Sequence, residues 1–448
     1  MIDWQIEIQI YSAMHGEIKG GNRLRVLIVN LQSVNHNNAT GITLRSIFSR
    51  FRKEDIYEVY MQPCLRASDA ISLQSERLQA GVCLPRKAAN RLIGKASVSN
   101  TKAAVILTEE RSFLRALRRR LIMLLDFEPV ILMPGLMRKI NLFRPDCIYT
   151  LGNAIDVMKL VVKLSVMLKI PVIPHFMDNW QTSHRYGKSR YPYHRKITQK
   201  WLKKLYSRSN CALVISERMA SEYTERWKVP HYALMNSVNT KSYHCPRTAS
   251  KKMSVLVYAG GLHLNRYKSL LQIGKAIDDY NQTHQCSLVL RVYTDDKSTT
   301  AYQEILSECS CVEFRSYVPH ELIMEVYRSA DILVHIETFD EGYRDFIRYS
   351  LSTKISEYLS VGRPIFLYAP DNIFISEYLK MNKAAVTVSS EVELPTALRR
   401  LLIPANAETV SRNAYELAKR NHDTEHLNSL LRRVFYPECE NGNEEEAW

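Results

Sequence analysis

The stretch that decides the fold spans residues 253–271 and reads MSVLVYAGGLHLNRYKSLL. Its apolar beginning, 253–258, is typical of a buried strand in a parallel sheet. Gly260 and Gly261 then form a turn, and a helical pattern follows over 268–280. Glycines between a strand and a helix let a phosphate approach the backbone, and a helix N-terminus favours negative charge. The stretch is neither G-x-G-x-x-G nor a Walker loop, so a structural turn followed by solvated cations stays an alternative.

Strand and helix patterns alternate on both sides of this unit. The further strand-like runs are 23–31, 146–151, 170–175, 211–216 and 232–236 before it, and 288–293, 312–317, 332–336, 364–368 and 385–388 after it. Strands that alternate with helices predict parallel sheets, and the polar stretch 241–252 divides the two series. We therefore expect an α/β chain with two Rossmann-like domains, at 1–245 and 246–410, that face a central cleft. One helical stretch, 408–434, ends the pattern, and in 411–448 we expect this C-terminal helix to pack back across the domains before an acidic tail.

Composition limits the class of protein but leaves the partner open. The chain has 448 residues, of which 46% are hydrophobic, and its 61 Lys+Arg against 46 Asp+Glu give a net charge of +15. That excess suits nucleic acid, an anionic membrane or a phosphorylated ligand. The nine cysteines show no CxxC pair and no zinc spacing, which predicts reduced thiols. The chain start lacks signal-peptide features and no apolar run reaches about 18 residues, so we expect a cytoplasmic protein.

A second motif, YSLSTKISEYLSVGRP, occupies residues 349–364. Ser352 and Thr353 lie at the start of a helix, where hydroxyls and free N–H groups bind anions. Glu357 lies one turn further along the same face and could accept both hydroxyls of a ribose. N-capping combined with a surface glutamate is the alternative interpretation.

A third motif, PHFMDNW at 174–180, follows a strand late in the first half. His175 and Asp178 form a candidate polar pair at the end of that strand, flanked by aromatic residues. A buried structural histidine is the alternative, because a single His-x-x-Asp pattern has little specificity.

Together, "YAGGLHLNRYKSL", "SLSTKISEYLSVGRPI" and "PHFMDNW" resemble the GT-B glycosyltransferases of the family-4 kind, especially the branch that builds bacterial surface polysaccharides. The resemblance extends from about residue 24 to about residue 434. It implies a nucleotide-sugar donor on the C-terminal domain, an acceptor on the N-terminal domain, and transfer with retention at the anomeric carbon. The pathway it implies is capsule, exopolysaccharide or O-antigen biosynthesis, with a UDP- or GDP-sugar as donor.

The resemblance also assigns roles to individual residues. On the donor side, it places Arg266 and Lys268 on the diphosphate, beside the turn at Gly260 and Gly261. Ser352 and Thr353 would bind the same phosphates, and Glu357 would bind the ribose. On the acceptor side, His175 and Asp178 would face the sugar, and Asn38 and Gly41 would lie near the acceptor. Ser216, Glu217 and Asn236 lie where the family has its "SE" and "N-G-V-D" segments.

The chain departs from the family pattern at one carboxylate. The family has two glutamates eight positions apart, but Tyr349 stands eight positions before Glu357. Glu337, Asp340 and Glu341 are candidate substitutes. These departures leave the contacts to the transferred sugar open.

The chemistry of the expected reaction follows from these groups. Cations and a helix N-terminus aimed at the leaving diphosphate stabilise the charge that grows there. The sequence has no Asp-x-Asp motif to hold a metal ion, so we expect no metal or other cofactor. A nucleotide-sugar epimerase of the same fold and a non-catalytic partner subunit stay as alternatives. Signatures of nucleic-acid-binding modules are absent, which disfavours nucleic acid as the partner.

Much of the positive charge falls on one segment, RSFLRALRRRLIMLL at 111–125. As a helix it would carry one apolar face bordered by arginines, which suits an anionic membrane surface. Membrane contact would fit an acceptor carried on a polyprenyl diphosphate and a peripheral location at the inner face of the plasma membrane. A surface helix that packs its apolar face on the domain core is the alternative.

Overall fold

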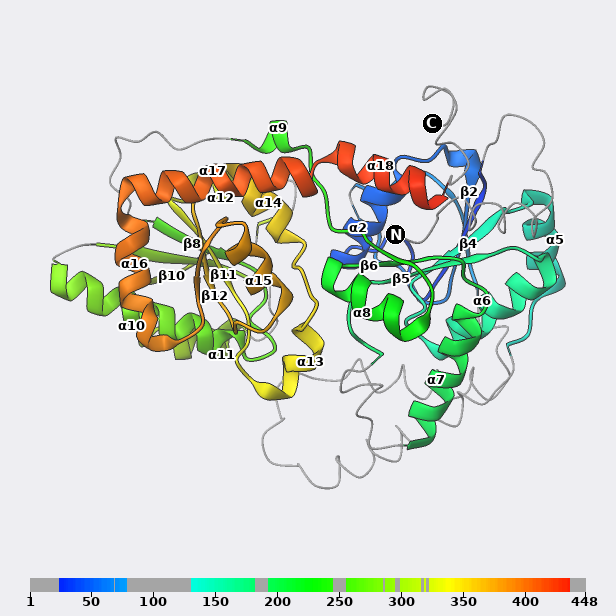
Figure 1. The fold of residues 1–448 in the computed structure, drawn as a ribbon, viewed down its shortest axis with the longest axis horizontal. Helices are drawn as coiled ribbons and strands as arrows, with labels where there is room; N and C mark the ends of the chain where they lie inside the picture. Colours follow the sequence, from blue (N-terminus) through cyan, green and yellow to red (C-terminus); the bar gives the residue numbers. More distant parts are fainter. Residues whose placement is uncertain are drawn as a thin grey trace.

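The computed structural model describes residues 24–67, 69–78, 130–181, 192–244, 255–284, 287–294, 299–315, 318–319 and 322–435. Within them the chain forms two sheets whose strands all pair in parallel, one in each half of the molecule (Figure 1). The prediction of two Rossmann-like α/β domains is therefore confirmed.

The first sheet has the order β3-β2-β1-β4-β5-β6-β7. Its strands are β1 (Val26–Asn30), β2 (Ile56–Tyr60), β3 (Gln74–Arg77), β4 (Cys147–Thr150), β5 (Val172–Phe176), β6 (Ala212–Val214) and β7 (His231–Ala233). Successive side chains of a strand point to opposite faces, so β1 sends Val26 and Ile28 into one apolar layer and Leu27 and Val29 into another. Both faces of the sheet are therefore buried.

Helices cover these two faces unequally. On the face of Val26, the apolar layer includes residues of α2 (Ala39–Phe48) and α18 (Thr424–Phe435). On the face of Leu27, it includes residues of α5 (Pro134–Phe143), α6 (Ile155–Leu168), α7 (Pro192–Tyr206) and α8 (Glu217–Trp227). This is the two-faced arrangement of a doubly wound domain.

Strands β2 and β3 were not predicted from the sequence. Glu58 interrupts the apolar run of β2, yet it is fully buried and accepts hydrogen bonds from Ser33 Oγ (2.9 Å) and Val34 N (2.5 Å). The edge strand β3 reads QSER and is mostly exposed. Neither strand shows the apolar alternation on which sequence patterns depend.

The second sheet has the order β10-β9-β8-β11-β12-β13. Its strands are β8 (Val255–Ala259), β9 (Val289–Tyr293), β10 (Val312–Arg315), β11 (Ile332–Ile336), β12 (Ile365–Tyr368) and β13 (Val386–Val388). One face packs against α10 (Arg266–His284), α11 (Thr299–Leu306) and α16 (Leu394–Leu402). The other packs against α12 (Ile323–Ser329), α14 (Lys354–Val361), α15 (Phe374–Met381) and α17 (Pro404–Asn421). Two short helices, α9 (Thr240–Tyr243) and α13 (Arg344–Ile347), complete this half.

The final stretch predicted to be helical at 408–434 is helical, but it is divided into two helices. Helix α17 lies along the second domain, and α18 continues over the first (Figure 1). The break falls at the buried His422, whose Nδ1 lies 2.8 Å from the carbonyl oxygen of Asn236 and whose Nε2 lies 2.8 Å from the Tyr378 hydroxyl. These contacts hold the chain where it crosses between the domains.

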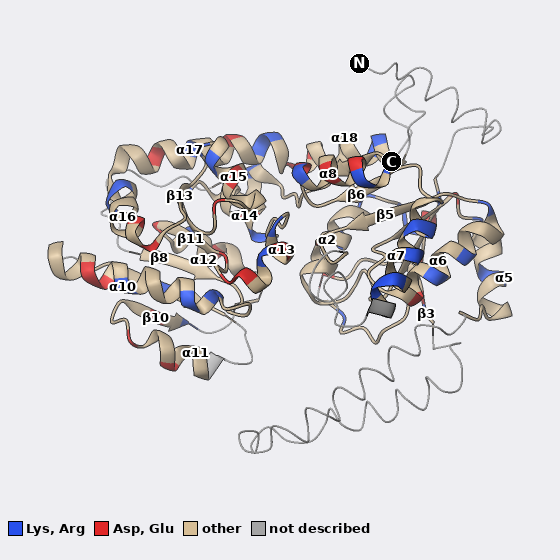
Figure 2. Cartoon of the chain, turned by 60° about the horizontal axis from the view of Figure 1, so that its bottom comes forward, with Lys and Arg blue, Asp and Glu red and all other residues tan. Residues whose placement is uncertain are grey.

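Part of the positive charge is visible along α7 (Figure 2). This helix reads PYHRKITQKWLKKLY, without an acidic residue, and Lys196, Lys200, Lys203 and Lys204 are exposed. The basic segment predicted at 111–125 lies outside the described residues. No helix in the described part of the chain is both long and apolar enough to cross a bilayer.

Candidate donor and acceptor sites

The first candidate site lies at the carboxyl edge of the second sheet, around the ends of the neighbouring strands β8 and β11. Strand β8 ends at Ala259 and turns through Gly260 and Gly261, and β11 leads into Glu337. The N-terminus of α14 reaches the same edge, since Lys354 Nζ donates a hydrogen bond to the carbonyl oxygen of Ala259 (2.6 Å). Ligands of open α/β sheets bind outside the carboxyl ends of the strands.

Arg266 is paired in this structure, which changes the role predicted for it. Its Nε and Nη2 donate to the two carboxylate oxygens of Glu337 at 2.8–3.0 Å, and the Glu337 side chain is 4% exposed. Although burial alone would raise it, the pKa of Glu337 is lowered to about 2 because Arg266 and His335 stabilise the carboxylate. Arg266 therefore has its charge balanced within the protein, and its Nη1 forms no hydrogen bond in the part of the chain that the structure describes.

Lys354 is the cation that the sequence interpretation missed. Its Nζ lies 5.1 Å from the centre of the Tyr258 ring, and among the described residues no carboxylate lies within ion-pair distance of it. Burial, and then the charge of Arg266, lower the pKa of Lys354 to about 8. The amine is thus still mostly protonated at neutral pH, and an anion bound beside it would neutralise its charge.

Gly260 leaves the space that Lys354 occupies. Its φ of +157° lies in the region that favours glycine, and a Cβ at this position would overlap Lys354 Nζ. The glycine turn of the first motif and Lys354 of the second motif, which are far apart in sequence, are therefore in contact.

The other predicted donor residues surround this lysine with different degrees of exposure. Ser352 and Thr353 are half-buried, and Thr353, the N-cap residue of α14, makes no side-chain capping hydrogen bond. Glu357 is only 7% exposed and accepts a hydrogen bond from the Tyr327 hydroxyl (3.1 Å). Lys268 is exposed near Asp340.

The carboxyl edge of the first sheet carries a neutral histidine and, in the following loop, one carboxylate. His175 is fully buried at the end of β5, with Nδ1 2.6 Å from the Tyr149 hydroxyl, and no described residue hydrogen-bonds to its Nε2. Burial lowers the pKa of His175 to about 3, so the imidazole is neutral. Asp178 is half-buried in the following loop, and burial raises its pKa to about 6.

Asn38 and Gly41 shape the loop that follows β1. Asn38 is the N-cap of α2, where its Oδ1 accepts a hydrogen bond from the N–H of Gly41 (2.8 Å). A Cβ on Gly41 would overlap the carbonyl oxygen of His36. Both residues therefore have a structural task in addition to the acceptor contact predicted for them.

The other residues singled out in the sequence have local partners. Ser216 caps α8, and the Oδ1 of Asn236 accepts a hydrogen bond from the Thr43 hydroxyl (2.6 Å). Asp340 accepts one from Asn265 (2.8 Å), and Glu341 pairs with Arg344 (2.5 Å). In the described part of the chain, no group of His, Cys, Asp and Glu side chains has the arrangement of a metal site.

Comparison with known proteins agrees with this geometry. Residues 274–431 match the family described as glycosyl transferase-like. A search of curated protein sequences finds no match.

Solved structures match over nearly the whole chain at low sequence identity. Sucrose-phosphate synthase from Thermosynechococcus elongatus is 14% identical, with a TM-score of 0.55 over 92% of this chain and 100% of that one. WaaG, a glycosyltransferase involved in lipopolysaccharide biosynthesis, is 10% identical, with a TM-score of 0.53 over 91% and 99%. An α,α-trehalose-phosphate synthase (UDP-forming) from Burkholderia vietnamiensis is 11% identical, with a TM-score of 0.56 over 92% and 99%. The whole chain therefore has the GT-B fold, and its second half matches a family described as glycosyl transferase-like.

Proposed function

We propose that the enzyme moves a sugar from a UDP- or GDP-sugar to a glycan or lipid-linked acceptor, with retention and without a metal ion. The observation that carries the proposal is Lys354, a half-buried cation at the N-terminus of α14 with no described carboxylate within ion-pair distance. A diphosphate is the anion that all such donors share, and a helix N-terminus beside a cation suits it.

The leaving diphosphate gains negative charge as the sugar departs. Preorganised groups stabilise that charge most, because they need not reorganise during the reaction. Lys354 is fixed by the carbonyl oxygen of Ala259 and the Tyr258 ring, and the Ser352 and Thr353 hydroxyls lie beside it in sequence. In the proposed mechanism these groups and the first N–H groups of α14 bind the phosphates, and Arg266 adds its Nη1.

The first domain is proposed to bind the acceptor and the transferred sugar. His175 is neutral and fully buried, so in this proposal it orders the end of β5 through Tyr149 and does not act as a general acid. Asp178, whose pKa is raised, accepts or donates a hydrogen bond according to pH. Asn38 and Gly41 place the start of α2 at the same edge of the sheet.

For the acceptor we propose a glycan or a polyprenyl diphosphate at an anionic membrane surface, in surface polysaccharide biosynthesis. The exposed lysines of α7 support an anionic partner for the first domain. The structural neighbour WaaG acts in lipopolysaccharide biosynthesis, and another neighbour is a UDP-forming synthase.

A nucleotide-sugar panel tests the proposal. The purified protein is incubated with UDP-glucose, UDP-galactose, UDP-N-acetylglucosamine and GDP-mannose, with and without bacterial polyprenyl-diphosphate glycans. Mass spectrometry then detects hydrolysis or transfer, and calorimetry detects binding. We expect one donor to bind and transfer; binding and turnover of none would overturn the proposal.

Two further measurements address the mechanism. NMR of the product shows whether the anomeric configuration of the donor is kept, which is the result expected for retention. Activity measured with EDTA should equal activity without it. Inversion, or loss of activity that Mg²⁺ or Mn²⁺ restores, would refute the corresponding part of the proposal.

A further inference from the structure

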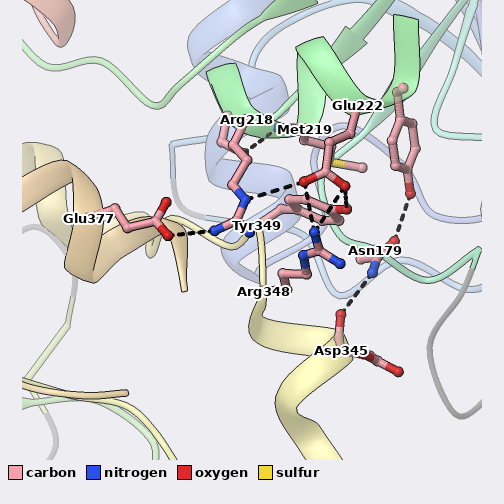
Figure 3. Close-up of polar contacts among 10 residues, drawn as sticks. Asn179, Arg218, Met219, Glu222, Asp345, Arg348, Tyr349 and Glu377 are labelled. Carbon is pink, nitrogen blue, oxygen red and sulfur yellow. Dashed lines mark hydrogen bonds and ion pairs between the residues drawn. The ribbon is translucent and has the colours of Figure 1, made fainter. Parts of the chain in front are cut away.

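A set of side chains joins the two domains beside the donor site (Figure 3). Glu222, on α8 of the first domain, accepts hydrogen bonds from Arg348 Nη2 (2.9 Å), from the Tyr349 hydroxyl and from Arg218 Nε (3.3 Å). Arg218 also pairs with Glu377 of α15 in the second domain (2.7 Å). We call these five residues the interdomain clamp.

The clamp combines exposed ion pairs with one buried contact. The charged side chains are 28–42% exposed, and ion pairs of this kind contribute little individually. Tyr349, in contrast, is 1% exposed, and its ring meets the ring of Tyr223 edge-to-face at 6.1 Å. The apolar cluster that contains both tyrosines is continuous between the domains. The packing of the Tyr349 ring therefore fixes the position of its hydroxyl. The carboxylate of Glu222 accepts the hydrogen bond that this hydroxyl donates.

Tyr349 occupies the position where the resembling family has a glutamate. A glutamate here would face the carboxylate of Glu222, and two neighbouring carboxylates repel each other. A tyrosine hydroxyl donates to that carboxylate instead. Although burial raises it, the pKa of Glu222 is lowered overall, because Tyr349, Arg348 and Arg218 stabilise its charged form. Residues 222 and 349 thus form a matched pair across the domains.

The clamp is connected directly to the proposed donor-binding residues. Arg348 and Tyr349 immediately precede the segment 350–354, and the backbone carbonyl of Arg348 accepts a hydrogen bond from Phe374 N (2.9 Å). A second interdomain contact lies just before them, where Asn179 Nδ2 donates to the carbonyl oxygen of Asp345 (2.8 Å). The first domain therefore holds the start of the chain segment that carries Lys354.

We propose that Glu222 is a positioning residue: by holding Tyr349 and Arg348 from the first domain, it keeps Lys354 in place for the donor diphosphate. This inference rests on the proposed function. It means that donor binding and the approach of the two domains are coupled, although Glu222 itself touches no substrate.

The first test measures the binding of UDP and GDP by calorimetry. Coupling between sites is typically about 5- to 150-fold, and we expect Glu222→Gln and Tyr349→Phe each to weaken nucleotide binding at the lower end of that range. Donor KM should rise by a similar factor while kcat changes less. The control is Glu225→Gln, one helical turn away on α8 and exposed, which should bind as the native protein does.

A double-mutant combination separates positioning from simple loss of stability. Tyr349→Glu should weaken nucleotide binding more than Tyr349→Phe, because the introduced carboxylate would repel that of Glu222. Adding Glu222→Gln should restore part of that loss, which a merely destabilised protein would not show. The nucleotide-induced rise in melting temperature, measured for each variant against its own unliganded form, provides the second readout.

The outcomes distinguish this inference from the proposed function. If the native protein binds UDP or GDP and the Glu222→Gln and Tyr349→Phe variants bind equally well, the positioning role is overturned and the proposed function stands. Failure of Glu222→Gln to rescue Tyr349→Glu also overturns it. If the native protein binds neither nucleotide and transfers no sugar, both proposals fail.

Discussion

The carboxyl edges of the two sheets carry opposite kinds of polar groups. The edge of the second sheet gathers charges that are buried or half-buried: Glu337, Arg266 and Lys354. The edge of the first has neutral His175 against Tyr149 and, in the next loop, the single carboxylate Asp178, whose pKa is raised to about 6. Both edges come from the same kind of domain, so the difference lies in the residues and not in the architecture.

In the proposed function, the two edges correspond to the two tasks of a transferase: binding the donor diphosphate and binding the hydroxyls of the acceptor. Holding buried charge requires partners, and Glu337 forms an ion pair with Arg266, whereas Lys354 has no carboxylate within ion-pair distance among the described residues and is attracted by Glu337 and Glu357 only from further away. An amine without a direct ion pair at this edge suits a diphosphate. A neutral histidine and one carboxylate, with no cation beside them among the residues named here, suit the hydroxyls of an acceptor, which carry no net charge. The following predictions test this contrast, from the largest expected effect to the smallest.

The largest expected effect is on stability, at the charged edge. Glu337→Gln leaves Arg266 buried without its partner, and breaking a buried pair in this way costs about 3–5 kcal/mol. Urea unfolding at pH 7 measures the loss, with the surface variant Glu391→Gln as control.

The same pair predicts a dependence of stability on pH. The folded-state pKa of Glu337 is about 2, below the ordinary value of 4.5. Its contribution is therefore present above pH 4.5 and is lost as pH falls toward 2. Unfolding free energies measured between pH 6 and pH 3 should fall less steeply in Glu337→Gln than in the native protein; parallel curves would contradict the assignment.

Removing the unpaired cation should abolish most activity. Lys354→Met takes away a preorganised group that faces the leaving phosphates, and loss of one such group costs about 10²–10³-fold in kcat. Stability should change little or increase, since a buried amine is replaced by an apolar side chain of similar length. Steady-state kinetics with the donor found in the panel measures the effect.

Displacing the same cation should have a smaller effect. In Gly260→Ala the new Cβ overlaps Lys354 Nζ, so the amine must move. A shift of about 1 Å at a reacting centre costs up to about 10²-fold in rate. Gly135→Ala, where a Cβ meets open space, is the matched control. Equal kinetics in the two variants would show that the position of Lys354 is unimportant.

A substitution at the carboxyl edge of the first sheet should have the opposite effect on stability. The pKa of Asp178 is raised from 3.8 to about 6 by burial, so its charged form destabilises the fold as pH rises through this range. Asp178→Asn should therefore stabilise the protein at pH 7, by about 1–3 kcal/mol, and leave stability at pH 3.5 unchanged. Urea unfolding at the two pH values provides the check; a destabilised variant at pH 7 would refute the burial argument.

The smallest effect is expected for the other cation predicted from the sequence. Lys268 is exposed, and solvent screens its charge. We expect Lys268→Met to change donor KM less than about threefold, a difference of under 1 kcal/mol. A change as large as that of Lys354→Met would show that both cations contact the diphosphate.

Local patterns in the sequence were sufficient for the domains and for most strands. Apolar runs such as 26–30 and 255–259 are strands with every residue buried or nearly so. The polar strand β3 and the Glu58-containing strand β2 lack that pattern, and the break between α17 and α18 depends on contacts of His422 with distant residues.

The candidate site was harder to predict because its contacts are not local. The sequence motifs contained Arg266 and Lys354, but Glu337 lies 71 positions from Arg266, and Lys354 meets the end of β8 across 95 positions. Tyr349 and Glu222 are 127 positions apart. Which cation is neutralised, and which keeps its charge for a ligand, follows from these pairings alone.

The most direct test of the central claim compares the nucleotide affinities of two lysine variants. Calorimetry with UDP and GDP is performed on the native protein, Lys354→Met and Lys268→Met. If Lys354 holds the donor diphosphate, the native protein and Lys268→Met bind one nucleotide with similar affinity and Lys354→Met loses at least about tenfold. Equal binding by Lys354→Met and the native protein would contradict the account.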